Sequence, residues 1–232
     1  YVASTYYTNA MWAIYEDGNP QRIAWGDRKR ACYDKYIQYA DHPIERVELP
    51  IGELTVSALL HFPRKPGPGE KFPCILYLPG MDGVKEDSPF VADPILERGM
   101  ALFSIDGPGQ GETRERGVKV TASNCEGSGK AAFAYLSKRP EVDDRRVAIF
   151  GSSMGSYWGT RIAAAEPGIK ACALSGVNLE PGQYTIFNTA SPTFKLNYMY
   201  MAGYDDEEAF DAFAQALTLK GVASKITCPY LI

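Results

Sequence analysis

The sequence predicts an α/β protein built on a doubly wound, mostly parallel β-sheet. Two observations carry this prediction. Short, continuously apolar runs such as CILYL (74–78) and VAIF (147–150) alternate with segments of helical periodicity, and such alternation is typical of this class. Strands that are apolar along their whole length belong to sheets covered on both faces, which are mostly parallel. The 232 residues suffice for one large domain, or for one domain with a small appendage.

The first segment, residues 1–41, is predicted to be helical, because apolar residues recur in it at spacings near the helical repeat. Pro43 ends it, since the residue before a proline is biased out of the α region. Runs typical of β-strands follow at 45–49 and 54–62. Buried strands and helices then alternate. The predicted strands are 74–78, 101–105, 147–150 and 171–174, and the predicted helices are 88–98, 120–138 and 154–166.

Residues 178–224 break this alternation. They are rich in Tyr, Phe, Met and acidic residues, and they are predicted to form helices inserted between two strands. Another buried strand is expected to begin at 228–232. We therefore expect a helical lid segment at 1–42, a core at 43–177, an inserted helical lid segment at 178–224 and the start of the next core strand at 225–232. A missing C-terminal part is also expected, because a buried parallel strand at a chain end leaves its sheet unfinished.

The composition argues against several classes of partner. A net charge of −4 disfavours nucleic acid and anionic membranes, because both select basic patches. The densest basic run, residues 28–30, is interpreted as a solvated helix face. No stretch approaches the apolar length of a membrane span. Five scattered cysteines without a CxxC pair indicate a reducing, cytoplasmic location.

No metal or organic cofactor is expected. The glycines of 107–111 do not complete a dinucleotide fingerprint, because Glu112 stands where the last glycine belongs. Gly129-Lys130 is followed by Ala131, which does not fit a phosphate-binding loop. The expected partner is a small-molecule substrate, with no nucleic acid and no membrane, and a homodimer is left open.

The motif that carries chemistry is Gly151-Ser152-Ser153-Met154-Gly155, which fits G-x-S-x-G. It lies between an apolar strand and a helix, the context in which this motif presents a serine nucleophile on a sharp turn. Ser153 is therefore the candidate nucleophile, and the Met154 N–H at the helix start is a candidate oxyanion donor. The alternative is a Gly- and Ser-rich helix cap. Ser152 and Ser156 lack glycines at both required offsets.

The loop after strand 74–78 is expected to supply the second oxyanion donor. The Met81 N–H is the first candidate and the Asp82 N–H the second, and an ordinary glycine turn is the alternative. In this arrangement the acid and the His follow the serine along the chain. No His occurs after His61, so the triad Asp and His are not present in this chain and are expected beyond Ile232. Glu180 is retained as a candidate acid, with a loop carboxylate as the alternative.

These residues resemble the α/β-hydrolase superfamily. The segments that carry the resemblance are LPGMDGVKED (78–87), DGPGQGE (106–112), RPEVDDRRVAIFGSSMG (139–155) and SKITCPYLI (224–232). Within the superfamily the chain is similar to the branch of 2,6-dihydroxypseudooxynicotine hydrolase and the fermentation-respiration-switch-type esterases. The resemblance implies a nucleophile at Ser153, an oxyanion hole from Met81 and Met154, and a lid from residues 1–41 plus 178–224. The family's Asp and His have no matching positions here.

The function predicted is acyl transfer to water by a serine hydrolase, through an acyl-enzyme on Ser153. Tyr184, Phe187 and Tyr198 of the inserted segment indicate a pocket for a small apolar or aromatic ester, although they can equally pack the lid on the core. One alternative is hydrolysis of a C–C bond in a β-diketone or acyl-aromatic ketone, because the branch includes such an enzyme. The other is a non-catalytic binding module.

Overall fold

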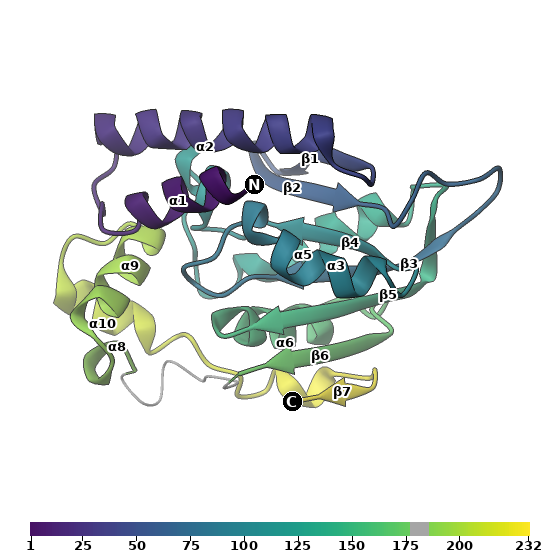
Figure 1. Ribbon diagram of the computed structural model, residues 1–232. Coiled ribbons are helices and arrows are strands. Elements are labelled where there is room, and N and C mark those ends of the chain that lie inside the picture. The colour runs from purple at the N-terminus through teal and green to yellow at the C-terminus, as the bar shows by residue number, and fades with distance from the viewer. Residues whose placement is uncertain (177–185) are drawn as a thin grey trace.

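The computed structural model describes residues 1–176 and 186–232, and these residues form a seven-stranded sheet in the order β1-β2-β4-β3-β5-β6-β7 (Figure 1). The strands from β4 to β7 are parallel, and β1 and β2 join them as an antiparallel hairpin. The doubly wound, mostly parallel sheet is therefore confirmed. Its strands are β1 (Ile44–Ile51), β2 (Leu54–His61), β3 (Phe72–Leu78), β4 (Ala101–Ile105), β5 (Val142–Ser152), β6 (Ala171–Ser175) and β7 (Tyr230–Leu231).

The continuously apolar strands lie at the centre of the sheet. Leu76 of β3 pairs with Phe103 of β4 on one side and with Ile149 of β5 on the other, and all three side chains are buried. The run expected at 228–232 gives only the two-residue β7, which pairs with β6. Its expected burial is wrong, because Leu231 is 67% exposed at the edge of the sheet that the described residues form.

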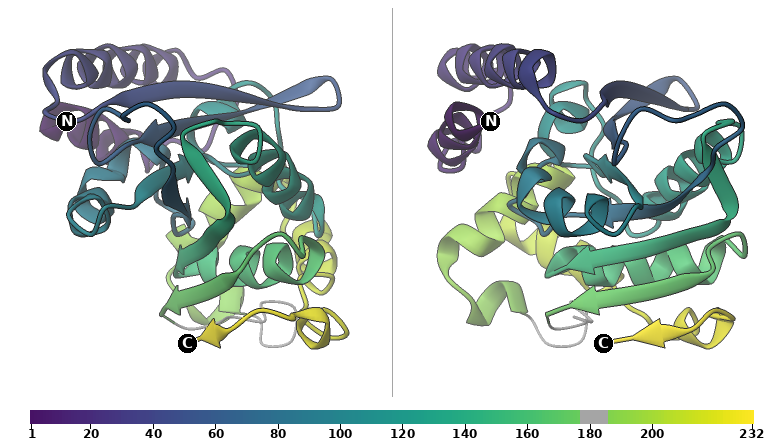
Figure 2. Two further views of the ribbon diagram at one scale, coloured as in Figure 1. Left: turned by 90° about the vertical axis from the view of Figure 1, so that its right-hand side faces the viewer. Right: turned by 45° about the vertical axis from the view of Figure 1, so that its right-hand side comes forward.

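Helices cover both faces of the sheet. The N-terminal helical segment is two helices, α1 (Val2–Met11) and α2 (Pro20–Tyr39), and α2 begins where the Asn19 side chain accepts the N–H groups of Gln21 and Arg22. Helix α3 packs on one face, and α5 and α6 pack on the other (Figure 2). The remaining helices are η1 (Lys85–Asp87), α3 (Pro89–Leu96), α4 (Gly111–Glu115), α5 (Asn124–Leu136), α6 (Met154–Ala165), α8 (Ile186–Thr189), α9 (Pro192–Ala202), α10 (Glu207–Ala214) and η2 (Ala223–Lys225).

The end of the sheet to which β5 and β6 point is flanked by two groups of helices. Helix α1 lies on one side of it, and α8, α9 and α10 lie on the other (Figures 1 and 2). Asp82, in the loop after β3, joins the two groups, because its Oδ1 accepts from the indole of Trp12 at 3.1 Å and from the amide of Asn197 at 2.7 Å. None of the helices formed by 1–176 and 186–232 is both long and apolar enough to span a membrane.

Candidate active site

Ser153 occupies a strained turn at the carboxyl end of β5. Its φ of 52° and ψ of −124° make it the one non-glycine residue with positive φ in the part of the chain that the structure describes. Such backbone strain is typical of functional sites. The Ser153 N–H donates to the carbonyl of Ser175 in the neighbouring strand end at 2.9 Å. The side chain remains exposed, so the turn places a hydroxyl at the carboxyl edge of the sheet.

The glycines of the motif allow this turn by close backbone packing. A Cβ at Gly155 would lie 2.1 Å from the Leu78 carbonyl oxygen, and one at Gly151 would lie 2.4 Å from the Gly155 carbonyl oxygen. Gly80 lies directly against the serine, because a Cβ there would lie 3.1 Å from the Cβ of Ser153. The loop after β3 therefore borders Ser153.

The neighbouring serines are differently placed. Ser152 Oγ lies 3.4 Å from the hydroxyl of Tyr77. Ser156 is buried, and its hydroxyl donates to the carbonyls of Gly151 and Ser175 at 3.4 and 3.3 Å. Ser153 is the exposed member of the three, which makes it the best placed to attack a substrate.

Two backbone amides are available beside Ser153. Met154 is the first residue of α6, so its N–H has no partner within the helix and lies at the positive end of the helix dipole. The second is the Met81 N–H, in the turn that the Gly83 N–H closes on the Gly80 carbonyl at 3.0 Å. The Asp82 N–H stays the alternative donor; its side chain bridges helices, and burial raises the pKa of its carboxyl group.

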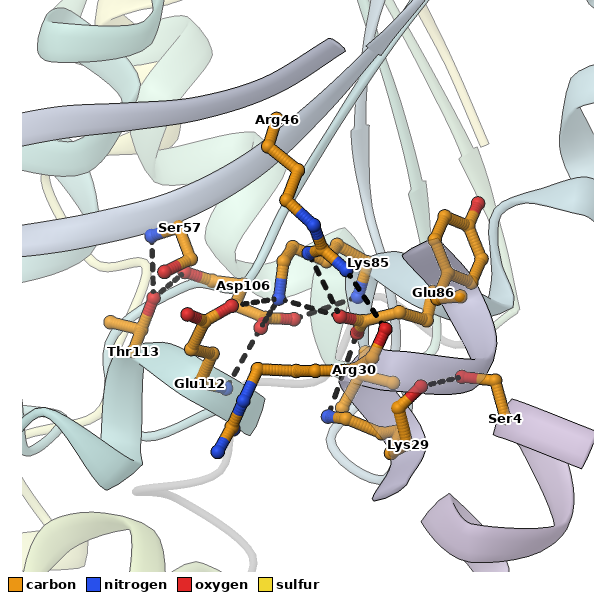
Figure 3. Close-up of polar contacts among 12 residues, drawn as sticks. Ser4, Lys29, Arg30, Arg46, Ser57, Lys85, Glu86, Asp106, Glu112 and Thr113 are labelled. Atoms are coloured by element: carbon orange, nitrogen blue, oxygen red, sulfur yellow. Dashed lines mark hydrogen bonds and ion pairs between the residues drawn. The ribbon is translucent and has the colours of Figure 1, made fainter. Parts of the chain in front are cut away.

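A buried charge network begins at Lys85, shortly after the 80–83 turn, and joins three segments of the chain (Figure 3). Asp106, after β4, accepts from the backbone N–H of Lys85 at 2.7 Å and from its ammonium at 2.9 Å. The same ammonium lies 2.9 Å from Glu86 and 3.0 Å from Glu112. Lys29 of α2 lies 3.5 Å from Glu86. Both side chains are fully buried, so the interpretation of residues 28–30 as a solvated face is wrong at Lys29.

The pKa values of Glu112, Glu86 and Lys85 are shifted by the opposite charges that surround them. Burial would raise the pKa of Glu112, but Lys85 and Arg116 hold it down at about 2. The pKa of Glu86 is likewise lowered against its burial by Lys29 and Lys85. Burial opposes the charge of Lys85, yet Asp106 and Glu86 raise its pKa. The charges of the network therefore compensate one another, and their contacts hold η1 against the segment that follows β4.

The two histidines lie far from the serine turn. His61 ends β2 and pairs with Leu102 at the start of β4, whereas Ser153 follows the carboxyl end of β5. His42 Nε2 lies 3.0 Å from His61 Nδ1, and burial lowers the pKa of His61 to about 3. Neither can therefore serve as a base for Ser153 from its place in the fold.

The predicted substrate-pocket aromatics are only partly described. Glu180 and Tyr184 lie outside the described residues. Phe187 and Tyr198 are buried with their ring centroids 5.0 Å apart, and both rings contact Phe210. These contacts pack α8, α9 and α10 against one another. Within 1–176 and 186–232 no three His, Cys, Asp or Glu side chains gather to hold a metal ion.

Sequence reasoning missed Gln110 and Lys29. Gln110 contacts the 80–83 turn and stands inside the glycine-rich segment 106–112, in which no residue was singled out for a role at the site. Lys29 lies four residues after Trp25 and four before Tyr33, on the apolar face of its helix. A lysine at such a position was a signal of burial with a partner.

The fold and the site define the class of the protein. A mostly parallel sheet with a serine on a sharp turn between strand and helix is the arrangement of an α/β hydrolase. The chain belongs to the FrsA-like esterase family, described as Esterase FrsA-like, which matches residues 1–206. The resemblance stated from the sequence is thereby confirmed.

The curated relatives are named as hydrolases. The 2,6-dihydropseudooxynicotine hydrolase of Paenarthrobacter nicotinovorans is 31% identical over 206 residues, which cover 88% of this chain and 54% of the relative. The 20-hydroxy-prefusarin hydrolase FUS2 of Gibberella moniliformis is 29% identical over 227 residues, which cover 93% of this chain and 52% of the relative. The chain thus spans about half the length of these relatives.

Solved structures agree on the fold. The crystal structure of 2,6-dihydroxy-pseudo-oxynicotine hydrolase matches with a TM-score of 0.83 at 27% identity, covering 98% of this chain and 62% of that chain. AbyA5 matches with a TM-score of 0.79 at 18% identity, covering 99% of this chain and 66% of that chain. At that identity AbyA5 supports the fold alone. Membership of the FrsA-like family and the α/β-hydrolase fold are therefore established for this chain.

Proposed function

We propose that this chain carries the nucleophile of a serine hydrolase that transfers an acyl group to water. The observation that carries the proposal is the backbone of Ser153, which has a φ of 52° and an exposed side chain beside Gly80. In the proposed reaction Ser153 Oγ bonds to the substrate carbonyl carbon while a base takes its proton. The Met154 and Met81 N–H groups hold the resulting oxyanion. The leaving group departs with that proton, and water then releases the acid.

The base must come from outside the described contacts of Ser153. Both histidines lie at the other end of the sheet, and in this fold the acid and the His follow the nucleophile. We therefore propose that the triad His and its acid lie beyond Ile232; Glu180 is the alternative candidate for the acid, within the chain. All five cysteines lie in the described residues and are free, which supports a reducing, cytoplasmic site of action.

The proposed substrate is a small apolar or aromatic ester. The helices α1 and α8 to α10 flank the edge where Ser153 lies (Figure 2), and we propose that they act as a lid over it. Hydrolysis of a C–C bond beside a ketone is the second candidate, favoured by the similarity to 2,6-dihydropseudooxynicotine hydrolase. Both reactions use the same serine and the same amides.

The test uses protein made from the complete coding sequence, with p-nitrophenyl esters and β-diketones as separate substrates. Turnover of the esters supports the first candidate, and turnover of the β-diketones alone supports the second. A fluorophosphonate probe should label wild type and Ser152→Ala, and should fail to label Ser153→Ala. Absence of labelling in wild type, or equal labelling of Ser153→Ala, would favour a binding module and overturn the proposal.

A further inference from the structure

Gln110 is a buried amide beside the loop that borders Ser153. It lies between β4 and α4, and only 3% of its surface is exposed. Its Nε2 donates to the Gly80 carbonyl at 2.7 Å and to the Gly83 carbonyl at 3.1 Å. Its Oε1 accepts the N–H of Gly107 at 3.0 Å. One orientation of the amide satisfies all three partners, because the carbonyls need the nitrogen and the N–H needs the oxygen.

The bond to Gly80 fixes the peptide group that joins Gly80 to Met81. In a trans peptide the C=O and the N–H point in opposite directions, and no cis peptide occurs among the described residues. Holding the Gly80 carbonyl toward Gln110 therefore turns the Met81 N–H to the opposite side. In residues 1–176 and 186–232 that N–H finds no protein acceptor, so it is available to a bound group.

Two donors hold the Gly80 carbonyl at once, the Gly83 N–H within the turn and the Gln110 amide from outside it. Gln110 is itself anchored on the segment after β4, where the Gly109 N–H donates to Val118 at 2.9 Å. The turn therefore cannot rotate without breaking contacts to a second strand end. Preorganised donors of this kind stabilise a transition state without reorganisation during the reaction.

We propose that Gln110 is a positioning residue, which aims the Met81 N–H at the oxyanion formed on Ser153. The inference rests on the proposed function, since it assigns a part to one member of the oxyanion hole. The Gln110 side chain bonds to Gly80, Gly83 and Gly107, and not to Ser153. It acts through the Gly80–Met81 peptide, and its loss should weaken the transition state more than the ground state.

The kinetic test compares Gln110→Met and Gln110→Glu in protein from the complete coding sequence. Methionine keeps the length and removes all three bonds, whereas glutamate keeps the Gly107 contact and removes both donors to the turn. Loss of a whole oxyanion donor costs about 100- to 1000-fold in kcat, so misorientation of one should cost about 10- to 100-fold with KM nearly unchanged. Gln215→Met, at an exposed position, is the matched control, and thermal unfolding confirms that each variant is folded.

A spectroscopic readout separates positioning from a structural role. Protein labelled with 15N-methionine is reacted with a fluorophosphonate, in which Ser153 Oγ bonds to phosphorus, fluoride leaves with the serine proton, and the phosphonyl oxygen takes the oxyanion position. In wild type the amide signals of Met81 and Met154 should both shift on reaction. In Gln110→Met and Gln110→Glu the Met154 signal should shift as before, while the Met81 shift should be lost or reduced.

The outcomes distinguish this inference from the proposed function. If wild type reacts and turns over substrate, but both Gln110 variants keep wild-type kcat and the full Met81 shift, the role of Gln110 is refuted and the function stands. If wild type does not react at Ser153, the proposed function itself is refuted, and the role of Gln110 falls with it. Should Gln110→Met not fold, Gln110→Glu alone decides by the same two readouts.

Discussion

At the scale of single residues, the site depends on positions where no side chain fits. Gly155 is the strongest case, because its Cβ would lie 2.1 Å from the carbonyl oxygen of Leu78, a backbone atom that cannot rotate away. Gly127 in α5 is the opposite case, since the nearest atom to a Cβ there lies 3.9 Å away on Ile51. Substitution by alanine should therefore have opposite effects at these two positions.

Gly155→Ala should lower the free energy of unfolding by about 3 kcal/mol, through a clash that moves β3 and α6 apart. It should also lower fluorophosphonate labelling of Ser153, because the turn that carries Ser153 depends on the close packing of Gly155 against the Leu78 carbonyl. Gly127→Ala should leave labelling unchanged and raise the free energy of unfolding by up to about 1 kcal/mol, because alanine is the better helix former. Urea unfolding and probe labelling check both. Equal effects of the two substitutions would contradict the packing argument.

Asp87 is a second residue whose environment has a measurable consequence. Its Oδ2 accepts the Val84 N–H at 3.0 Å, but burial raises its pKa to about 6. The unfolded chain has the lower pKa, so the folded state binds this proton more tightly. The stabilisation it gives is complete below the unfolded pKa and is lost as pH rises from about 4 through about 6.

Asp87→Asn keeps an acceptor for Val84 and removes the titration. The free energy of unfolding of this variant relative to wild type should therefore rise by about 2–3 kcal/mol between about pH 4 and about pH 8. Urea unfolding across that range measures the difference, and Asp205→Asn, at an exposed loop position, is the control. A difference that does not change with pH would show that Asp87 carries its charge in the folded protein at no cost.

At the scale of elements, the N-terminal helix α2 is fixed to the core by a buried ion pair. Lys29 meets Glu86 of η1 with both side chains fully buried, and Lys85 and Arg46 are the other cations beside Glu86. Lys29→Met should cost about 3–5 kcal/mol in unfolding free energy, because one partner is lost and Glu86 is left with less compensation. Arg28→Met, one residue away and exposed, should change it little. Urea unfolding decides, and similar losses in both variants would contradict the argument.

Elements were predictable from the sequence where local pattern determines them. The apolar runs gave the central strands, and Asn19-Pro20 marks the start that α2 adopts. The helix predicted over 120–138 is the shorter α5. Its Gly129 lies against α6, because a Cβ there would lie 2.3 Å from Ile162 and no larger residue fits between the two helices.

Contacts between distant segments were not predictable. Asp82 bonds to Trp12 and Asn197, which are 70 and 115 residues away, and only the fold brings the three together. The helix pattern places Lys29 on the apolar face, but its partner Glu86 lies in another element, so the ion pair itself could not be predicted. The G-x-S-x-G turn was the exception at the site, because strand, turn and helix are contiguous and their strain follows from local geometry.

At the scale of the whole molecule, Tyr200 joins three distant segments beside the active-site edge. Its ring lies between two guanidinium groups, those of Arg22 from α2 and Arg114 from α4, each 4.4 Å from the ring centroid. Arg22 also donates to the carbonyls of Met11 and Ile14 at 2.8 and 2.6 Å, which ties down the connection between α1 and α2. Arg114 donates to the Tyr200 carbonyl at 2.9 Å. One ring thus links the N-terminal helices to α9.

Tyr200→Leu should weaken the attachment of the N-terminal helices to α9, because leucine fills part of the volume but offers no aromatic face to either guanidinium. Two cation–π contacts predict a loss of about 1–3 kcal/mol in unfolding free energy. The connection at 12–19 should then be cut faster by a low concentration of protease, since Arg22, which binds the Met11 and Ile14 carbonyls, loses its contact with α9. Tyr200→Phe keeps the ring and should match wild type in both measurements. If leucine and phenylalanine give the same cleavage rate, the ring does not hold the N-terminal helices, and their attachment rests on the Asp82 bridge and the Lys29 ion pair.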